Sequence, residues 1–196
     1  MSTAYRWIDD DQSASAVADR LKTVVNYAID TEFHREKTYF PQLALIQIRV
    51  GDETFLLDAP RLSAPVLAEV FNNNAVAILH AAQQDLEVLS LACGAKPEVI
   101  FDTQIAAMVA GFGDQASYDS LCRSLAGVQI DKAHRFSDWS ARPLSESQLA
   151  YAAADVTHLR KIFVSLTLSL EREGRIDWVG QEMGALADPA TYLTDP

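Results

Sequence analysis

Short apolar runs alternate along the chain with stretches that have the apolar spacing of amphipathic helices. Strand-like runs, in which apolar residues are continuous or alternate, lie at 24–30, 42–50, 53–58, 76–80 and 99–101. Helix-like stretches, with apolar residues three and four apart, lie at 13–22, 63–72, 84–93, 103–110, 117–126 and 146–171. After a first helix, the chain therefore reads as three strands followed by alternating helices and strands.

This order predicts an α/β fold. The Gly51-Asp52 turn signal joins the second and third strands, which indicates an antiparallel meander over the first three strands. The later strands are separated by helices, as is typical of parallel strands joined by right-handed crossovers. We therefore expect a mixed β-sheet flanked by α-helices.

Length and composition suit one globular domain. A chain of 196 residues can bury a full core. We expect the domain to occupy 1–187 and a linker-like tail to occupy 188–196. Hydrophobic residues make up 49% of the chain, but no apolar run approaches the ~20 residues of a membrane span, and the polar start lacks a signal-peptide core. We expect a soluble, cytoplasmic protein with no membrane partner.

Two acids follow the first apolar strand. Asp30 and Glu32 are two residues apart, so on an extended strand their side chains point to the same face. Two carboxylates on one face repel each other unless a cation lies between them, and Mg²⁺ takes carboxylate oxygens as ligands. The pair therefore indicates a metal site, although acids at strand ends are often only solvated.

Three further residues have the same double interpretation. Asp85 falls in the first turn of a predicted helix, where an acid also stabilises the helix N-terminus. Tyr151 and Asp155 lie one turn apart on one face of a helix that begins with a capping-box pattern, Ser145 and Gln148. Taken alone, Asp85 fits that structural role, and Tyr151 and Asp155 fit a solvated polar flank with an ordinary amphipathic tyrosine.

The order and spacing of these five residues resemble the DEDD superfamily of 3′→5′ exonucleases, in the branch whose last motif is Tyr-x-x-x-Asp. The chain is most similar to the ribonuclease D family over roughly residues 5 to 190. The similarity is carried by the blocks DTEFHREKTYFPQLALIQI (30–48), HAAQQDLEVL (80–89), FDTQIAA (101–107) and DWSARPLSESQLAYAAADVTHL (138–159). The resemblance implies a ribonuclease H-like fold. Many ribonuclease D chains continue into helical HRDC domains that help to hold RNA, and we expect none within these 196 residues.

The resemblance also implies a chemistry. It predicts hydrolysis of the 3′-terminal phosphodiester of single-stranded or short RNA, releasing nucleoside 5′-monophosphates, with two Mg²⁺ or Mn²⁺ ions roughly 4 Å apart. Asp30, Glu32 and Asp155 are then the ligands of one ion, and Asp30 with Asp85 the ligands of the other. The resemblance also implies that Tyr151 hydrogen-bonds and orients the attacking water. A phenol with a pKa of ~10 is a poor base at neutral pH, so most of the water's acidity must come from its metal.

Several alternatives stay open. The acids do not distinguish an exoribonuclease from a 3′→5′ DNA exonuclease, and a non-catalytic nucleic-acid-binding module with the same fold is a third possibility. The RNA partner, whether tRNA precursor tails or short oligonucleotides, and the oligomeric state are not indicated. The net charge of −11 argues against tight binding of long duplex, but suits an enzyme that engages the last few nucleotides of a single strand.

Candidate substrate contacts are weaker predictions. Phe33, beside the acids, is placed to stack on a terminal base or simply to pack in the core. His80 is placed to touch substrate or to serve as a structural hydrogen-bonding group. A short basic and aromatic segment before the Tyr151 helix is either a substrate-contacting loop or a solvated one; its candidate residues are Lys132, Arg135, Trp139 and Arg142.

Overall fold

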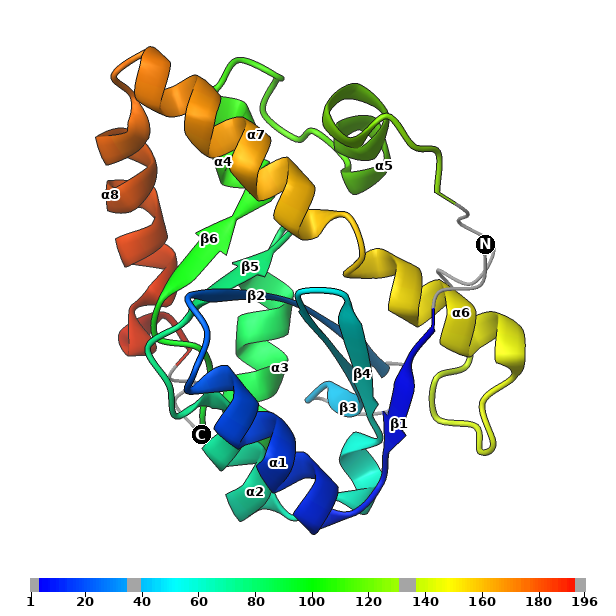
Figure 1. The fold of residues 1–196 in the computed structure, drawn as a ribbon. Coiled ribbons are helices and arrows are strands. Elements are labelled where there is room, and N and C mark those ends of the chain that lie inside the picture. Colours follow the sequence, from blue (N-terminus) through cyan, green and yellow to red (C-terminus); the bar gives the residue numbers. More distant parts are fainter. Residues whose placement is uncertain (1–3, 35–39, 131–136, 193–196) are drawn as a thin grey trace.

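The computed structural model describes residues 4–34, 40–130 and 137–192. Its centre is a six-stranded sheet in the order β1-β4-β3-β2-β5-β6 (Figure 1). The strands are β1 Arg6–Ile8, β2 Asn26–His34, β3 Gln42–Val50, β4 Glu53–Leu57, β5 Val76–Leu79 and β6 Ile100–Asp102. β2, β3 and β4 form the predicted antiparallel meander, whereas β5 and β6 continue the sheet in parallel with β2, so the expected mixed sheet is confirmed. The short edge strand β1 was not predicted.

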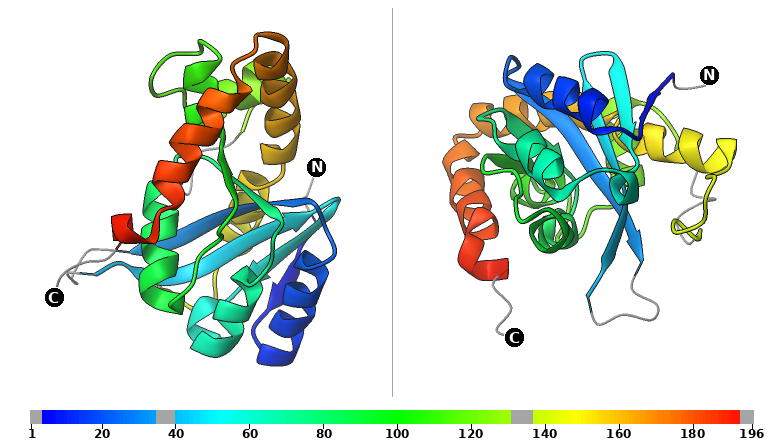
Figure 2. Two further views of the ribbon diagram at one scale, coloured as in Figure 1. Left: turned by 90° about the vertical axis from the view of Figure 1, so that its left-hand side faces the viewer. Right: turned by 90° about the horizontal axis from the view of Figure 1, so that it is seen from below.

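Helices cover both faces of this sheet (Figure 2). They are α1 Asp11–Leu21, α2 Ala64–Phe71, α3 Gln83–Cys93, α4 Thr103–Val109, α5 Tyr118–Leu121, α6 Glu146–Asp155, α7 Leu159–Arg172 and α8 Ile176–Ala187. Short turns of 3-10 helix occur at Ala59–Arg61 and Pro189–Tyr192, and a π-helical turn occurs at Cys122–Ala126. The main apolar cluster joins α1, α2 and α3 to the sheet, and a smaller cluster packs α6 against β3 and β4. In the part of the chain that the structure describes, no helix has the length and apolar character to cross a membrane.

The predicted single helix over 146–171 is wrong, because it is interrupted between Asp155 and Leu159. At the break, the Thr157 hydroxyl donates to the Ala153 carbonyl, and the His158 amide donates to the Tyr118 hydroxyl at 3.3 Å instead of continuing the helix. The apolar stripe runs on across the break, since Val156 and Leu159 are both buried. The sequence pattern alone therefore did not reveal the interruption, which ends α6 at Asp155.

The C-terminal region also differs from the prediction. α8 was missed because Gly180 and Gly184 weaken its helical signal, yet it buries Val179 and Met183 against the core. The first part of the tail that we expect to be linker-like forms the 3-10 turn Pro189–Tyr192, and its last residues, 193–196, lie outside the described residues. The Tyr192 hydroxyl donates to the Leu186 carbonyl at 2.7 Å, and its ring lies under the Lys96 ammonium.

Candidate active site

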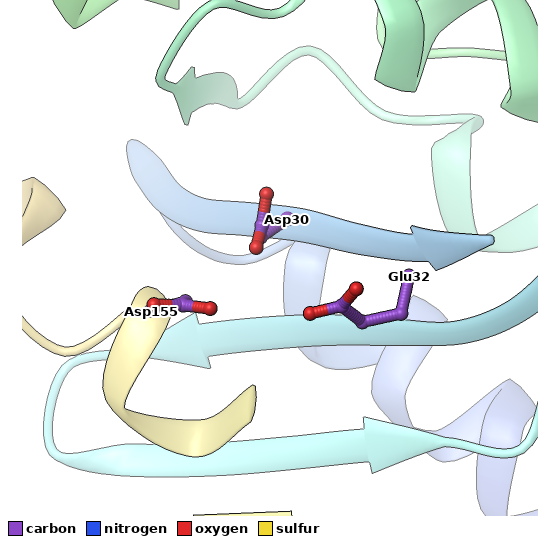
Figure 3. Close-up of side chains that lie close together, drawn as sticks. All are labelled: Asp30, Glu32 and Asp155. Atoms are coloured by element: carbon purple, nitrogen blue, oxygen red, sulfur yellow. The ribbon is translucent and has the colours of Figure 1, made fainter. Parts of the chain in front are cut away.

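Three carboxylates from distant parts of the sequence meet on one face of the sheet. Asp30 and Glu32 project from β2, and Asp155 comes from the last residue of α6 (Figure 3). One oxygen from each of the three lies within 4.8 Å of the others. α6 is held over the sheet by Ala152 and Ala153, which pack in the smaller apolar cluster. The predicted convergence of the first long strand and the Tyr151 helix is therefore observed.

Asp85 approaches the same strand from its open edge. β2 pairs with β5 only from Asn26 to Ala28, so the strand beyond that point has a free side. Asp85, in the first turn of α3, accepts a hydrogen bond from the hydroxyl of Thr31, which lies in this part of β2. Its carboxyl group is not one of the cluster of three, but it is near enough to Asp30 for their negative charges to interact. The fourth acid thus flanks the cluster on the α3 side.

The electrostatics of the four acids are unfavourable without a cation. Burial raises the pKa of Asp30 to about 6, and burial together with the charges of its acidic neighbours raises the pKa of Glu32 to about 10. Burial and the charge of Asp30 hold the pKa values of Asp85 and Asp155 well above the ordinary aspartate range. A hard divalent ion takes carboxylate oxygens as ligands and removes this repulsion, so the donor set fits Mg²⁺ or Mn²⁺.

Tyr151 lies one turn before Asp155 and contributes a phenol to the site. A hydrogen bond from its hydroxyl opposes the rise in the pKa of Asp155. Burial and the charges of Asp155, Glu32 and Asp30 in turn raise the pKa of the Tyr151 phenol above its ordinary value. The phenol therefore keeps its proton at neutral pH and acts as a hydrogen-bonding group. Its ring is backed by the Trp139 ring, with the centroids 6.1 Å apart.

Two of the predicted substrate contacts have partners within the protein. Trp139 is only 3% exposed and has no face open for stacking on a base. Arg142 is engaged by a buried acid and by backbone carbonyls: its Nε and Nη2 atoms donate to Asp58 at 3.0 and 2.6 Å, and Nη2 also donates to the Ala44 carbonyl at 2.9 Å. Both side chains are thus engaged within the protein, and a contact between either of them and substrate stays a prediction.

Arg142 also contacts the backbone of β3 close to Glu32. The register between β2 and β3 shifts beside Glu32, so that Leu45 pairs with Glu32, Leu43 pairs with Phe33, and Ala44 is left between them. Arg142 binds the carbonyl of this extra residue. A β-bulge of this kind redirects neighbouring side chains, and here it follows directly after the acid. Arg142 thus connects the loop before α6 to the strand that faces Glu32.

The remaining predicted contacts divide into three cases. His80 is half-buried, its Nδ1 lies 3.0 Å from the Thr103 hydroxyl, and its ring lies 5.7 Å from that of Tyr118, which favours the structural interpretation. Phe33 is half-buried beside Glu32, and its stacking on a base stays a prediction. Lys132 and Arg135 fall outside the described residues.

Asp102 has two roles in the structure. It caps α4 by accepting from the Gln104 amide at 2.8 Å. It also accepts from the amides of Ala81 and Ala82 at 3.0 and 2.8 Å, where Ala81 has a positive φ of 55°. The carboxylate therefore fixes the turn between β5 and α3 and sets the start of the helix that carries Asp85. Nothing in the sequence links positions 20 residues apart in this way.

Comparisons with known proteins agree with the geometry. Residues 5–171 match the family model described as 3′-5′ exonuclease. Ribonuclease D of Acidiphilium cryptum is 53% identical over 192 residues, which cover 96% of this chain and 49% of that protein. Ribonuclease D of Gluconacetobacter diazotrophicus is 52% identical with the same coverage. The chain spans about half the length of these curated relatives.

Solved structures show the same fold. The crystal structure of Escherichia coli RNase D, described as an exoribonuclease involved in structured RNA processing, superposes with a TM-score of 0.92 at 31% identity and covers 98% of this chain and 52% of that one. Brucella melitensis NrnC with bound Mg²⁺ superposes with a TM-score of 0.75 at 31% identity, covering 85% of this chain and 84% of that one. The predicted ribonuclease H-like fold and the similarity to ribonuclease D are therefore confirmed. Because the family model covers most of its length, the chain belongs to the 3′-5′ exonuclease family.

Proposed function

We propose that this protein is a metal-dependent 3′→5′ exoribonuclease that removes nucleoside 5′-monophosphates from the 3′ end of single-stranded or short RNA. The observation that carries the proposal is the cluster of Asp30, Glu32 and Asp155, whose oxygens lie within 4.8 Å of one another. Such an anionic cluster would repel a phosphodiester unless cations were bound. Family membership and the ribonuclease D relatives support the choice of reaction.

The acids supply ligands for two divalent cations. Asp30, Glu32 and Asp155 would hold one, and Asp30 with Asp85 the other, which agrees with the Mg²⁺ found in the Brucella melitensis relative. When bound, such ions act as Lewis acids and stabilise negative charge on the attacking and leaving oxygens. The protein's part is to gather the carboxylates, which α6 and the first turn of α3 achieve from opposite sides of β2.

Tyr151 orients the attacking water. Its phenol stays protonated at neutral pH, so it holds a hydrogen bond without accepting the proton. The Trp139 ring limits the positions that the phenol can take. This division of labour makes Tyr151 important for the rate and not for binding, because the hydrogen bond it offers is used in the reacting geometry.

We expect the substrate to be short or single-stranded, and we expect the enzyme to prefer RNA over DNA. The net charge of −11 disfavours a long phosphate-binding face, and another structure of the Brucella melitensis relative is bound to pGG, at 29% identity and a TM-score of 0.80. The Escherichia coli relative is described as processing structured RNA. Both tRNA precursor tails and short oligonucleotides therefore belong in the test. We place the activity in a domain over 1–187 and in the cytoplasm.

A ladder of 5′-labelled RNAs of several lengths, incubated with Mg²⁺ or Mn²⁺, tests this function. The proposal predicts stepwise shortening from the 3′ end, its loss in EDTA, and slower shortening of DNA with the same sequence. Binding without shortening would favour the non-catalytic module instead. Equal shortening of DNA would favour the DNA exonuclease, and internal cleavage would contradict both exonuclease alternatives.

A further inference from the structure

Gln47 is a buried polar residue that the proposed reaction does not use. It lies at the middle of β3 and is 0% exposed. Both its Nε2 and its Oε1 are buried without a hydrogen-bond partner among the residues that the structure describes. A buried amide in this state costs free energy relative to an apolar side chain of the same shape, so its presence calls for an explanation.

The register places Gln47 beside the acid cluster. It pairs directly with Asp30 across the antiparallel β2–β3 ladder, and the side chains of such a pair point to the same face, about 5 Å apart at Cβ. On its other side, Gln47 pairs with Leu56 of β4. α6, which carries Tyr151 and Asp155, packs over this part of β3 and β4. Gln47 therefore lies in the layer directly next to Asp30.

Asp30 is the polar residue that pairs with Gln47 in the ladder. Leu45 and Leu56 are fully buried and apolar. Arg49, two residues along the strand, is engaged with the Thr54 hydroxyl at 2.7 Å. Asp30 is the acid that both proposed cations share, so a small rotation of its carboxyl group affects both. An amide N–H next to it is the kind of group that fixes a ligating carboxylate in one orientation.

We propose that Gln47 is a positioning residue for the acid cluster, whose side-chain amide donates a hydrogen bond to the Asp30 carboxylate when that carboxylate binds a divalent cation. This inference rests on the proposed function, because it assigns Gln47 to the same metal site. Hydrogen-bond partners of metal-ligating carboxylates typically raise metal affinity about 10- to 100-fold. The amide thus lowers the stability of the metal-free fold and raises the affinity for the ion.

Replacing Gln47 by Met separates this role from simple packing. Met has a similar shape and no amide, so Q47M should unfold in EDTA at the same or a higher temperature than wild type. Its affinity for Mn²⁺, measured by titration calorimetry, should fall by about 10- to 100-fold. RNA shortening by Q47M should be weak at low Mn²⁺ and should recover when Mn²⁺ is raised. L56M, a change of similar size on the other side of Gln47, is the control and should leave Mn²⁺ affinity unchanged.

Two results would overturn the inference. One is a Q47M protein that binds Mn²⁺ as tightly as wild type. The other is that Q47M and a second apolar variant, Q47L, both unfold in EDTA at a lower temperature than wild type. That result would show that the amide stabilises the fold itself. Failure of wild-type protein to bind Mn²⁺ or to shorten RNA would instead contradict the proposed function, so the two failures are distinguishable.

Discussion

The two faces of β2 carry opposite chemistry. On the face that we call the apolar face, Tyr27 and Ile29 are buried with α1, α2 and α3 in the main apolar cluster. On the other, here called the acidic face, Asp30 and Glu32 lie beside Asp155. The pKa values on the acidic face are raised by burial and by like charge, so that face opposes folding in the metal-free protein. The comparison indicates that one face holds the strand in place so that the other can gather charge.

The strongest way to break this contrast is to remove one charge from the acidic face. Asp155→Asn keeps the shape of the side chain but removes a metal ligand. We expect the rate of RNA shortening to fall about a thousand-fold or more, which corresponds to a rise of about 4 kcal/mol in the activation free energy. Because the repulsion between the acids is reduced, the variant should unfold in EDTA at a higher temperature than wild type. Single-turnover assays and thermal unfolding measure the two effects.

Asp114→Asn is the matched control for that experiment. Asp114 is exposed, so the same chemical change should leave both the rate and the unfolding temperature close to wild type. Normal turnover by D155N would show that Asp155 is not part of the active site.

Arg142→Met tests the support behind the acidic face. The change leaves Asp58, which is 4% exposed, without its cation, and we expect the free energy of unfolding to fall by on the order of 3 kcal/mol. Urea denaturation measures the loss. The double variant R142M/D58N should recover part of it, because the uncompensated charge is then removed. R172M, at an exposed arginine of α7, serves as control, and equal small effects in R142M and R172M would show that the Asp58 pair carries no stability.

Tyr151→Phe sharpens the account by removing one hydroxyl from the acidic face. We expect kcat to fall about a hundred-fold with little change in KM, because the role that we propose for the hydroxyl is to orient the water and not to bind RNA. Tyr5→Phe, which changes a half-buried tyrosine packed near α6, should leave kcat unchanged. An unaltered kcat in Y151F, or a change confined to KM, would exclude the orienting role.

The stability of the metal-free protein should also depend on pH. The pKa of Asp30 is raised to about 6 and that of Glu32 to about 10, so the folded state binds protons that the unfolded state has released. Stability in EDTA should therefore decrease as the pH rises from 5 to 8. Urea denaturation at several pH values measures it, and the slope should be smaller in E32Q. Stability that increases with pH over this range in wild type, but not in E32Q, would contradict the raised pKa values.

Much of this structure was predictable from local pattern. The meander, the capping box at Ser145 and the place of Asp85 in a first helical turn all follow from residues close together in the sequence, and the structure confirms them. The clustering of the acids was predicted through resemblance, because no local pattern brings Asp30 near Asp155. The break before α7 was not predictable, since it depends on Tyr118, which lies 40 residues away from His158.

The substrate contacts show where sequence reasoning reached its limit. Trp139 and Arg142 have the composition of a nucleic-acid-binding loop, but their partners are Tyr151, Asp58 and Ala44, which are set by tertiary packing. Gln47 gave no signal at all within an apolar strand, because its significance comes from the residue opposite it on β2. The contacts of these residues depend on tertiary packing, which the sequence alone does not show.

The central claim is that Asp30, Glu32 and Asp155 form one divalent-cation site, and a crystal structure of the protein with Mn²⁺ tests it most directly. The anomalous scattering of manganese locates the ion independently of the protein coordinates. The account predicts a peak ligated by all three carboxylates, and its absence in crystals of D155N. A wild-type crystal saturated with Mn²⁺ that shows no peak there, or shows the peak at residues other than these, would contradict the claim.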